Sequence, residues 1–258
     1  MDAIVTAGGI PEPGEPLYPY TNGGSKALLD IAGKPMIQWV LDALDGANRV
    51  ERVWIVGLPE PADLRCQKLA GYLPNQENMV ENIRSGVQQI LEINPKTQHV
   101  LTVSSDIPAL QSDMVDWVVE TTMQTDHDVY YNIISKQVME KRFPSSKRSY
   151  IHLRGVEVCG GDMNVIRART VTGNEELWRR LVDARKNALK QAALVGYDTL
   201  FLLLLRLLTI EGAEKRACKK LGITGRAILC PYAEVGMDVD KPHQLEILRA
   251  DLERAAVA

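Results

Sequence analysis

Short apolar runs alternate with stretches of helical apolar spacing through the first half of this chain. This alternation predicts a parallel β-sheet whose strands are connected by crossover helices packed on its faces. We therefore predict an α/β fold with a mostly parallel central sheet flanked by helices. The expected strands are Ala3 to Thr6, Val53 to Val56 and Val100 to Val103, and the expected helices are Pro35 to Leu44 and Met79 to Ile93.

The second half of the chain is richer in helical pattern. From Glu175 to Thr209 the spacing is almost wholly helical, with a break near Gly196, and Ala213 to Leu221 predicts one more helix. We interpret 174–222 as a helical insertion within a single domain that spans 1–258. The remaining expected elements are a helix at Asp113 to Thr122, a polar loop at Pro144 to Ser149, strands at Val129 to Ile134, Ala227 to Cys230 and Glu234 to Val239, and a closing helix at Pro242 to Leu252.

Charge and composition disfavour several classes of protein. The formal net charge of -3 arises from 30 Lys and Arg and 33 Asp and Glu residues without a strong basic cluster, so we expect no nucleic-acid binding. The apolar run Leu200 to Ile210 contains Arg206 and is shorter than the ~20 residues that cross a bilayer. We therefore expect no membrane span and interpret this run as a buried helix or a subunit contact.

The same features predict a cellular compartment. The chain leads from Met1 straight into an apolar segment, without the basic flank and small-residue cleavage site of a secretory signal. The cysteines are too widely separated for a CxxC pair or a zinc cluster, and this usage fits a reduced, cytoplasmic environment. They are Cys66, Cys159, Cys218 and Cys230.

A glycine pair directly follows the first expected strand. Ala7-Gly8-Gly9 opens a long loop rich in proline and glycine, which ends at Ser25-Lys26. Glycine lets backbone N–H groups approach phosphate oxygens closely, and a lysine adds a mobile positive charge. The segment is therefore a candidate phosphate-binding loop, although an ordinary strand-to-loop turn has the same local pattern.

Two carboxylate motifs accompany this loop. The apolar run before Asp106 places its carboxylate at the carboxyl end of an expected strand, where open α/β sheets bind ligands, although Asp is also common as a helix cap. Near the end of the chain, Asp238 and Asp240 are two residues apart and would face the same side of a strand. Asp240 is better placed to cap the helix that begins near Pro242. Asp106 and Asp238 are therefore candidate ligand-binding carboxylates, and one or two carboxylates plus substrate phosphates typically suffice to hold Mg²⁺.

The order of these segments resembles the MobA-like and sugar-phosphate nucleotidyltransferase superfamily, whose NTP transferase domain has a GT-A-like fold. The family pattern is an L-A-A-G-x-G loop, a Pro-Lys pair, a G-K-P helix start, a D-x-P segment and a closing D-V-D-T-P-E-D-L segment. The resemblance extends over most of the chain and implies a Rossmann-like sheet, a Mg²⁺ cofactor held by Asp106 and Asp238, and catalytic roles for Lys26, Asp106 and Asp238. The corresponding residues are Val5-Thr6-Ala7-Gly8-Gly9, Ser25-Lys26-Ala27-Leu28-Leu29, Ile31-Ala32-Gly33-Lys34-Pro35-Met36-Ile37, Asp106-Ile107-Pro108 and Val235-Gly236-Met237-Asp238-Val239-Asp240-Lys241-Pro242.

The glycine loop departs from the family pattern. Family loops commonly read G-x-G-x-R, whereas Gly8-Gly9 is followed here by Ile10-Pro11-Glu12. Because the arginine that would contact the triphosphate is missing, nucleotide binding would depend on the backbone from Ala7 to Gly9 and on Lys26. Glu12 and Glu15 would repel a triphosphate if they pointed inward.

The resemblance also implies two substrate-binding segments. Asn82-Ile83-Arg84-Ser85-Gly86-Val87 is similar to a helix start that contacts the base and ribose in family members, with Asn82 in the place of a serine. Cys159 to Asn164 is similar to a glycine-containing segment near the acceptor, and its candidate residues are Gly160, Gly161 and Asn164. A surface position for Asn82 and a plain β-turn at the two glycines are the alternatives.

The resemblance implies a magnesium-dependent nucleotidyltransferase that transfers NMP from a nucleoside triphosphate to a phosphorylated or hydroxyl small-molecule acceptor and releases pyrophosphate. The stretch 174–222 would serve a partner, a possible homodimer or simply the core. Two alternatives stay open. A GT-A-type glycosyltransferase using a sugar nucleotide would account for the D-x-D string Asp238-Val239-Asp240, and a catalytically silent nucleotide-binding protein would account for the missing arginine. Pyrophosphate release from a triphosphate distinguishes these functions.

Overall fold

The parallel half of the sheet is formed by four strands from the first half of the chain. The structure, a computed structural model, describes residues 1–60, 63–173 and 196–257. Its strand β1 (Asp2–Thr6) lies between β4 (Arg52–Val56) and β6 (His99–Ser104), and β5 (Leu69–Leu73) lies beyond β4. All of these pairs are parallel, as the alternating sequence pattern predicts.

The other half of the sheet contains antiparallel strands. Strand β10 (Met163–Arg167) is antiparallel to both β6 and β7 (Val129–Ser135). On β7, the antiparallel strand β9 (Val156–Gly160) is followed by β8 (Ile151–Leu153), and β11 (Gly225–Cys230) pairs with β7 in parallel. The fold is therefore the expected α/β class, a Rossmann-like central sheet flanked by helices, with antiparallel strands in its second half.

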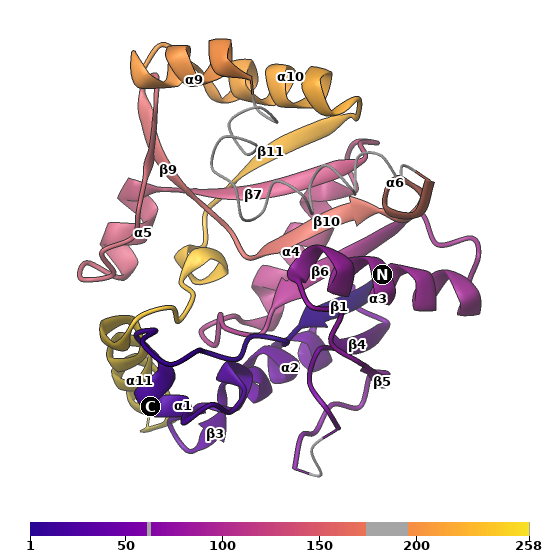
Figure 1. Ribbon diagram of the computed structural model, residues 1–258, viewed down its shortest axis with the longest axis vertical. Helices are drawn as coiled ribbons and strands as arrows, with labels where there is room; N and C mark the ends of the chain where they lie inside the picture. Colours follow the sequence, from indigo (N-terminus) through magenta and orange to yellow (C-terminus); the bar gives the residue numbers. More distant parts are fainter. Residues whose placement is uncertain (61–62, 174–195, 258) are drawn as a thin grey trace.

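Helices cover both faces of the sheet (Figure 1), and the alternation of side chains along β1 explains why. Ala3 and Val5 belong to one buried apolar cluster, whereas Ile4 belongs to the other, because successive strand residues face opposite sides. The first cluster includes apolar residues of α2 (Met36–Gly46), α4 (Ser112–Thr122) and α11 (Pro242–Val257). The second includes residues of α3 (Met79–Ile93) and α6 (Ala168–Gly173).

Further helices, strands and turns complete the described part of the chain. They are α1 (Tyr18–Thr21), the 3-10 turn η1 (Lys26–Leu28), β2 (Asp30–Ile31), β3 (Lys34–Pro35), α5 (Lys136–Arg142), α9 (Tyr197–Leu204), α10 (Ile210–Leu221) and the 3-10 turn η2 (Ala233–Gly236). In Figure 1, α9 and α10 lie at one end of the molecule, with α10 beside β11, far from α1 and α11. Among the described residues, no helix is long and apolar enough to cross a membrane.

The predicted strand from Glu234 to Val239 is wrong. The chain forms η2 there and continues to Val239 without regular structure. All residues from Ala233 to Val239 are buried, and continuous burial produces the same apolar pattern as a buried strand. Instead of joining a ladder, the segment forms single backbone hydrogen bonds, from Asp162 N to Val235 O at 2.8 Å and from Val239 N to Asp106 O at 3.0 Å. These bonds hold the segment against the chain just after β6 and just before β10.

The apolar run from Leu200 to Ile210 is only partly the buried helix that the sequence suggests. Helix α9 ends at Leu204, which is 80% exposed, and Leu205 and Leu207 are also exposed. The break expected near Gly196 coincides with a positive φ of 97° at that glycine. The rest of the predicted helical stretch, 174–195, lies outside the described residues.

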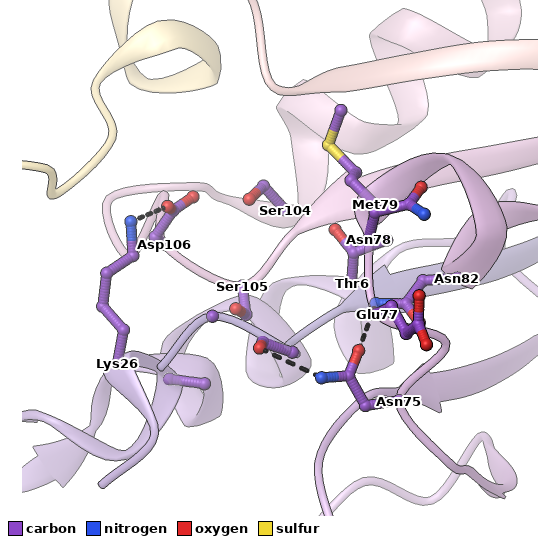
Figure 2. A pocket seen from close by; sticks show the side chains of 13 residues that line it. Thr6, Lys26, Asn75, Glu77, Asn78, Met79, Asn82, Ser104, Ser105 and Asp106 are labelled. Carbon is purple, nitrogen blue, oxygen red and sulfur yellow. Dashed lines mark hydrogen bonds and ion pairs between the residues drawn. The ribbon is translucent and has the colours of Figure 1, made fainter. Parts of the chain in front are cut away.

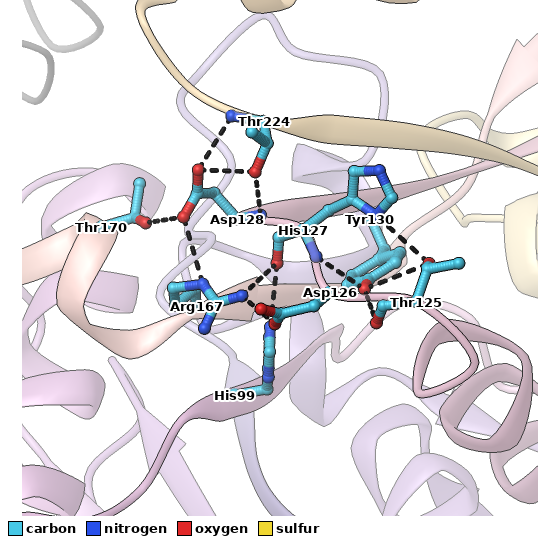
Figure 3. Close-up of polar contacts among 9 residues, drawn as sticks. All are labelled: His99, Thr125, Asp126, His127, Asp128, Tyr130, Arg167, Thr170 and Thr224. Atoms are coloured by element: carbon cyan, nitrogen blue, oxygen red, sulfur yellow. Dashed lines mark hydrogen bonds and ion pairs between the residues drawn. The ribbon is translucent and has the colours of Figure 1, made fainter.

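A network of ion pairs and hydrogen bonds joins the starts of β7 and β11 to the end of β10 (Figure 3). Arg167, only 6% exposed, pairs with Asp126 and Asp128. Asp128 accepts hydrogen bonds from Thr224 N at 2.8 Å and from Thr170 Oγ1 at 2.9 Å. Because Thr170 precedes and Thr224 follows 174–222, Asp128 connects the two ends of that stretch to the sheet.

Candidate functional site

The candidate site lies where β1 and β6 end. Parallel strands that run side by side bring their carboxyl ends to the same edge of the sheet, so Gly8 and Gly9 after β1 lie near Asp106 after β6. Between them is a cavity of about 280 Å³ (Figure 2). Its lining residues are Thr6, Gly8, Gly9, Lys26, Ala27, Asn75, Glu77, Asn78, Met79, Asn82, Ser104, Ser105 and Asp106.

Gly8 has no room for a side chain. A Cβ atom at this position would lie 2.6 Å from Asn75 Oδ1 and 2.9 Å from Asn82 Nδ2. The adjacent backbone is held by a hydrogen bond from Ala7 N to Val56 O at 2.8 Å, and Ala7 itself is 2% exposed and outside the cavity lining. Glycine therefore leaves backbone, rather than a side chain, facing the cavity.

Lys26 reaches the acidic side of this cavity from η1. Its backbone N–H donates to Gly9 O at 2.9 Å, which joins η1 to the glycine pair. Lys26 Nζ lies 2.5 Å from Asp106 Oδ2 and 2.8 Å from Asp240 Oδ1, and Figure 2 shows the Asp106 contact. Burial alone would lower the pKa of Lys26, but the carboxylates of Asp106 and Asp240 outweigh burial and raise it above its ordinary value. Lys26 is thus a cation at neutral pH.

Three carboxylates gather beside Lys26. Asp106, Asp238 and Asp240 each offer an oxygen within 4.8 Å of the others, and the first two residues are each 8% exposed. Asp106 Oδ1 is buried and accepts no hydrogen bond from the described part of the chain. Hard oxygen donors with a free lone pair suit a divalent cation such as Mg²⁺, so the residues fit the metal that the sequence predicts.

Asp240 has a different environment from the one expected. Its carboxylate contacts Lys26, while its own N–H and that of Lys241 donate to Gln244 Oε1 at 3.0 and 2.9 Å. The side chain of Gln244, rather than that of Asp240, therefore accepts the hydrogen bonds from the N–H groups that precede α11. The side chain of Asp240 belongs to the acidic group with Asp106 and Asp238.

Sequence reasoning did not identify two further charged residues of this site. Arg148 forms an ion pair with Asp238, and its Nη2 lies 4.0 Å from Asp162 Oδ2. Burial, followed by the negative charge of Asp106, raises the pKa of Asp162 to about 7. Asp162 lies within Cys159 to Asn164, the segment that was selected for its two glycines. An acidic residue in a turn before a strand is itself a recognisable candidate for a functional site. Arg148 lies in the expected polar loop, where no motif distinguishes it.

Asn82 lines the cavity, but other protein groups occupy its polar atoms. It is 3% exposed; its Oδ1 accepts from Gln76 N at 2.7 Å, and its Nδ2 donates to Asn75 Oδ1 at 3.1 Å. Asn75 Nδ2 in turn lies 3.4 Å from Gly8 O (Figure 2). Asn82 therefore is not a surface residue, and it holds the loop before α3 against the glycine pair.

The acceptor candidates Gly160, Gly161 and Asn164 do not line this cavity. Gly161 N donates to Asn132 O at 2.8 Å, and Asn164 bonds Asn132 N through Oδ1 and Gly161 O through Nδ2. A Cβ at Gly161 would lie 3.1 Å from Asn132 O. These residues connect β7 to the turn before β10, and that turn carries Asp162.

The acidic loop residues Glu12 and Glu15 also lie outside this cavity. Glu15 Oε2 accepts a hydrogen bond from Glu12 N at 2.9 Å, so it stabilises the loop locally. Glu15 lines a neighbouring hollow of about 480 Å³ that shares Gly9 and Lys26 with the cavity. Neither glutamate therefore lines the cavity beside Gly8, although Glu15 lies in the adjacent hollow.

Comparison with known proteins identifies a family and one curated relative. The model of the MobA-like NTP transferase domain matches residues 4–173. A probable molybdenum cofactor guanylyltransferase from Thermococcus gammatolerans is 28% identical over 97 residues, which are 38% of this chain and 48% of that protein. The match thus spans about half the length of the curated relative.

Solved structures match over nearly the whole chain. A hypothetical transferase from Thermus thermophilus has a TM-score of 0.81 and 33% identity, covering 95% of this chain and 98% of its own. CMP:2-keto-3-deoxy-manno-octonic acid synthetase complexed with CTP has a TM-score of 0.60 at 16% identity, covering 98% of both chains. 2-C-methyl-D-erythritol 4-phosphate cytidylyltransferase, also from Thermus thermophilus, has a TM-score of 0.53 at 15% identity and the same coverage. The last two show similarity of fold alone.

Proposed function

Because this chain belongs to the MobA-like NTP transferase domain family, we propose that it transfers the nucleoside monophosphate of a nucleoside triphosphate to an acceptor oxygen and releases pyrophosphate. The observation that most supports this reaction is the cavity at the ends of β1 and β6. There, glycine backbone, a protonated lysine and a buried carboxylate face one space. Backbone donors and a fixed cation suit a triphosphate, and a carboxylate suits its accompanying metal.

The glycine pair and Lys26 would bind the triphosphate. Without an arginine after Gly9, Lys26 is the side-chain cation that lines the cavity among the described residues. Asp106 and Asp240 hold its ammonium group on the acidic side, so its charge is oriented before substrate binds. Preorganised charge of this kind stabilises the negative charge that develops on the reacting phosphate oxygens.

Asp106, Asp238 and Asp240 would hold the divalent cation, which we propose is Mg²⁺. When bound, the metal would supply charge neutralisation and orientation for the phosphate oxygens. The position of these carboxylates depends on the chain itself, because the hydrogen bond from Val239 N to Asp106 O joins the two segments that carry Asp106 and Asp238.

We propose that the acceptor binds beside Asp162, because this carboxylate is close enough to Asp106 to interact with its charge but does not line the cavity beside the glycine pair. Gly160, Gly161 and Asn164 would then act by fixing this turn rather than by contacting the acceptor through their side chains. A phosphorylated acceptor is ionised at neutral pH and attacks the α-phosphorus without a general base, whereas a hydroxyl acceptor must lose a proton. We therefore propose a phosphorylated small molecule as the first acceptor class to test.

The experiment measures pyrophosphate release with ATP, GTP, CTP and UTP, each with Mg²⁺ and pooled phosphorylated acceptors. The wild type is compared with Asp106→Ala and with Asp113→Ala, a matched control in which an exposed aspartate of α4 is removed. Release that needs one triphosphate, an acceptor and Asp106, but not Asp113, supports the proposal.

Two other outcomes would replace the proposed reaction. Tight triphosphate binding without release under any combination would indicate a silent nucleotide-binding protein. Transfer of sugar from a sugar nucleotide, without pyrophosphate release from triphosphates, would indicate a glycosyltransferase that uses Asp238 and Asp240 as its D-x-D pair.

A further inference from the structure

The loop after α5 is shaped so that one arginine enters the acidic site. Phe143, at the end of α5, is 2% exposed, and Ser146 is 1% exposed. His243 Nε2, from the first turn of α11, lies 3.0 Å from Ser146 O and donates to it. Lys147 then adopts a left-handed conformation with φ 49°, which is unfavourable for a residue with a side chain. Arg148 follows this turn.

Arg148 contacts acidic residues from two separate segments. It forms an ion pair with Asp238, in the segment before α11, and its Nη2 lies 4.0 Å from Asp162 Oδ2, in the turn before β10. The side chains of Arg148 and Asp238 are only 16% and 12% exposed. Solvent therefore screens their interaction weakly, and each charge strongly affects the other.

The same carboxylate of Asp238 belongs to the group that fits a divalent cation. A carboxylate oxygen paired with a guanidinium has less capacity to bind a metal, and two cations near one carboxylate repel each other. Lys26 forms ion pairs with Asp106 and Asp240 in the same site, but it also lines the cavity proposed to bind the nucleotide. Arg148 does not line that cavity, so its contacts point to a role with the carboxylates of Asp238 and Asp162 and not with the nucleotide.

We propose that Arg148 is a positioning residue that holds the Asp238 carboxylate in place and competes with the divalent cation for it. The inference rests on the proposed function, because it assigns Asp238 to the metal site. Removal of Arg148 has two opposite consequences. The affinity for a divalent cation rises, because the competing charge is lost, and turnover falls, because the carboxylate loses the group that orients it. A residue that only stabilises the fold would not raise metal affinity.

The test titrates Mn²⁺ alone into the full-length protein and follows bound Mn²⁺ by calorimetry or electron paramagnetic resonance. Arg148→Gln is expected to bind Mn²⁺ roughly tenfold more tightly than the wild type, since it removes one nearby charge. Arg148→Lys keeps the charge but loses the forked geometry, so its affinity is expected between the two. Lys147→Gln, which removes the adjacent exposed charge, is the matched control and should stay within about twofold of the wild type.

Equal or weaker Mn²⁺ binding by Arg148→Gln would overturn the inference. If that variant does not fold in a thermal melt, Arg148→Lys decides, because an affinity at or below that of the wild type contradicts competition. Asp106→Ala separates the two proposals. If Mn²⁺ binding and pyrophosphate release need Asp106 but Mn²⁺ affinity is indifferent to Arg148, only the inference fails. If no variant binds Mn²⁺ and no triphosphate yields pyrophosphate, the proposed function fails with it.

Discussion

Lys26 connects three parts of the site through two kinds of contact. Its backbone bonds Gly9, and its ammonium group pairs with Asp106 and Asp240, which come from separate parts of the chain. The pKa of Lys26 lies above its ordinary value, because the two carboxylates outweigh burial. Its charge therefore persists well into alkaline pH, and deprotonation of Lys26 should not limit activity near neutrality.

Replacement of Lys26 by Gln should lower pyrophosphate release by about 100- to 1,000-fold, the range typical for loss of one preorganised charge-stabilising group. Lys34→Gln is the matched control, since Lys34 is an exposed cation that pairs with Asp42 away from the cavity. Steady-state kinetics with the preferred triphosphate, beside a thermal melt of each variant, checks this expectation. Near-wild-type turnover in folded Lys26→Gln would show that backbone and metal alone bind the phosphates.

Motif order and the family resemblance together singled out Gly8, Lys26, Asp106 and Asp238 as candidates, and the structure brings them to one edge of the sheet. Arg148 and Asp162 carry no comparable motif, and only the structure adds them to the site. Arg148 acquires its position from the left-handed turn at Lys147 and the docking of its loop on α11. No periodicity in the sequence records such contacts, because they depend on tertiary packing.

At the scale of elements, the regular spacing of apolar residues was the reliable signal for the position of a helix. Helix α3 begins and ends at Met79 and Ile93, where its apolar spacing begins and ends, and Asn78 caps it by accepting from Glu81 N at 3.0 Å. The segment from Glu234 to Val239 shows the limit of this approach. Its residues are buried where the chain passes the end of β6 and the start of β10. Their apolar character therefore results from this burial and not from membership of a strand.

The contacts of Asp128 predict that substitution of this residue destabilises the second half of the fold (Figure 3). Asp128→Ala removes hydrogen bonds to Thr224 and Thr170 and leaves the buried Arg167 with one fewer carboxylate. We expect the free energy of unfolding to fall by about 2 kcal/mol. Urea unfolding measures the change, and Asp126→Ala is the control, because this carboxylate is 79% exposed and its loss should cost less. An equal effect of the two variants would contradict this assignment.

The stabilisation that Asp128 contributes depends on pH. Burial alone would raise the pKa of Asp128, but hydrogen bonds from Thr224 and Thr170 and the charge of Arg167 lower it below its ordinary value. A depressed pKa means that the unfolded chain binds the proton more readily. The stabilisation is therefore complete above the unfolded pKa of about 4 and disappears as pH falls through the lower folded value. The difference between wild type and Asp128→Ala should be largest near neutrality and should shrink toward a pH of about 3.

At the scale of the whole molecule, the site lies where the parallel and antiparallel halves of the sheet meet. Strand β6 belongs to both halves, because it pairs with β1 on one side and with β10 on the other. Asp106 follows the end of β6, and Asp162 lies in the turn that enters β10. Segments from the beginning, middle and end of the chain thus meet at one edge, and a ligand bound there would connect all of them.

This arrangement predicts that a triphosphate with Mg²⁺ stabilises the entire chain. A ligand at about 100 times its Kd adds roughly 2.7 kcal/mol to the stability of the folded state, which corresponds to roughly 5–10 °C in Tm for a chain of this size. Thermal melts with ATP, GTP, CTP and UTP, each with and without Mg²⁺, measure the shift. Only the preferred triphosphate should produce the full shift, and Asp106→Ala should lose most of it while Asp113→Ala keeps it. An undiminished shift in the Asp106→Ala variant would show that binding does not use the site at the end of β6.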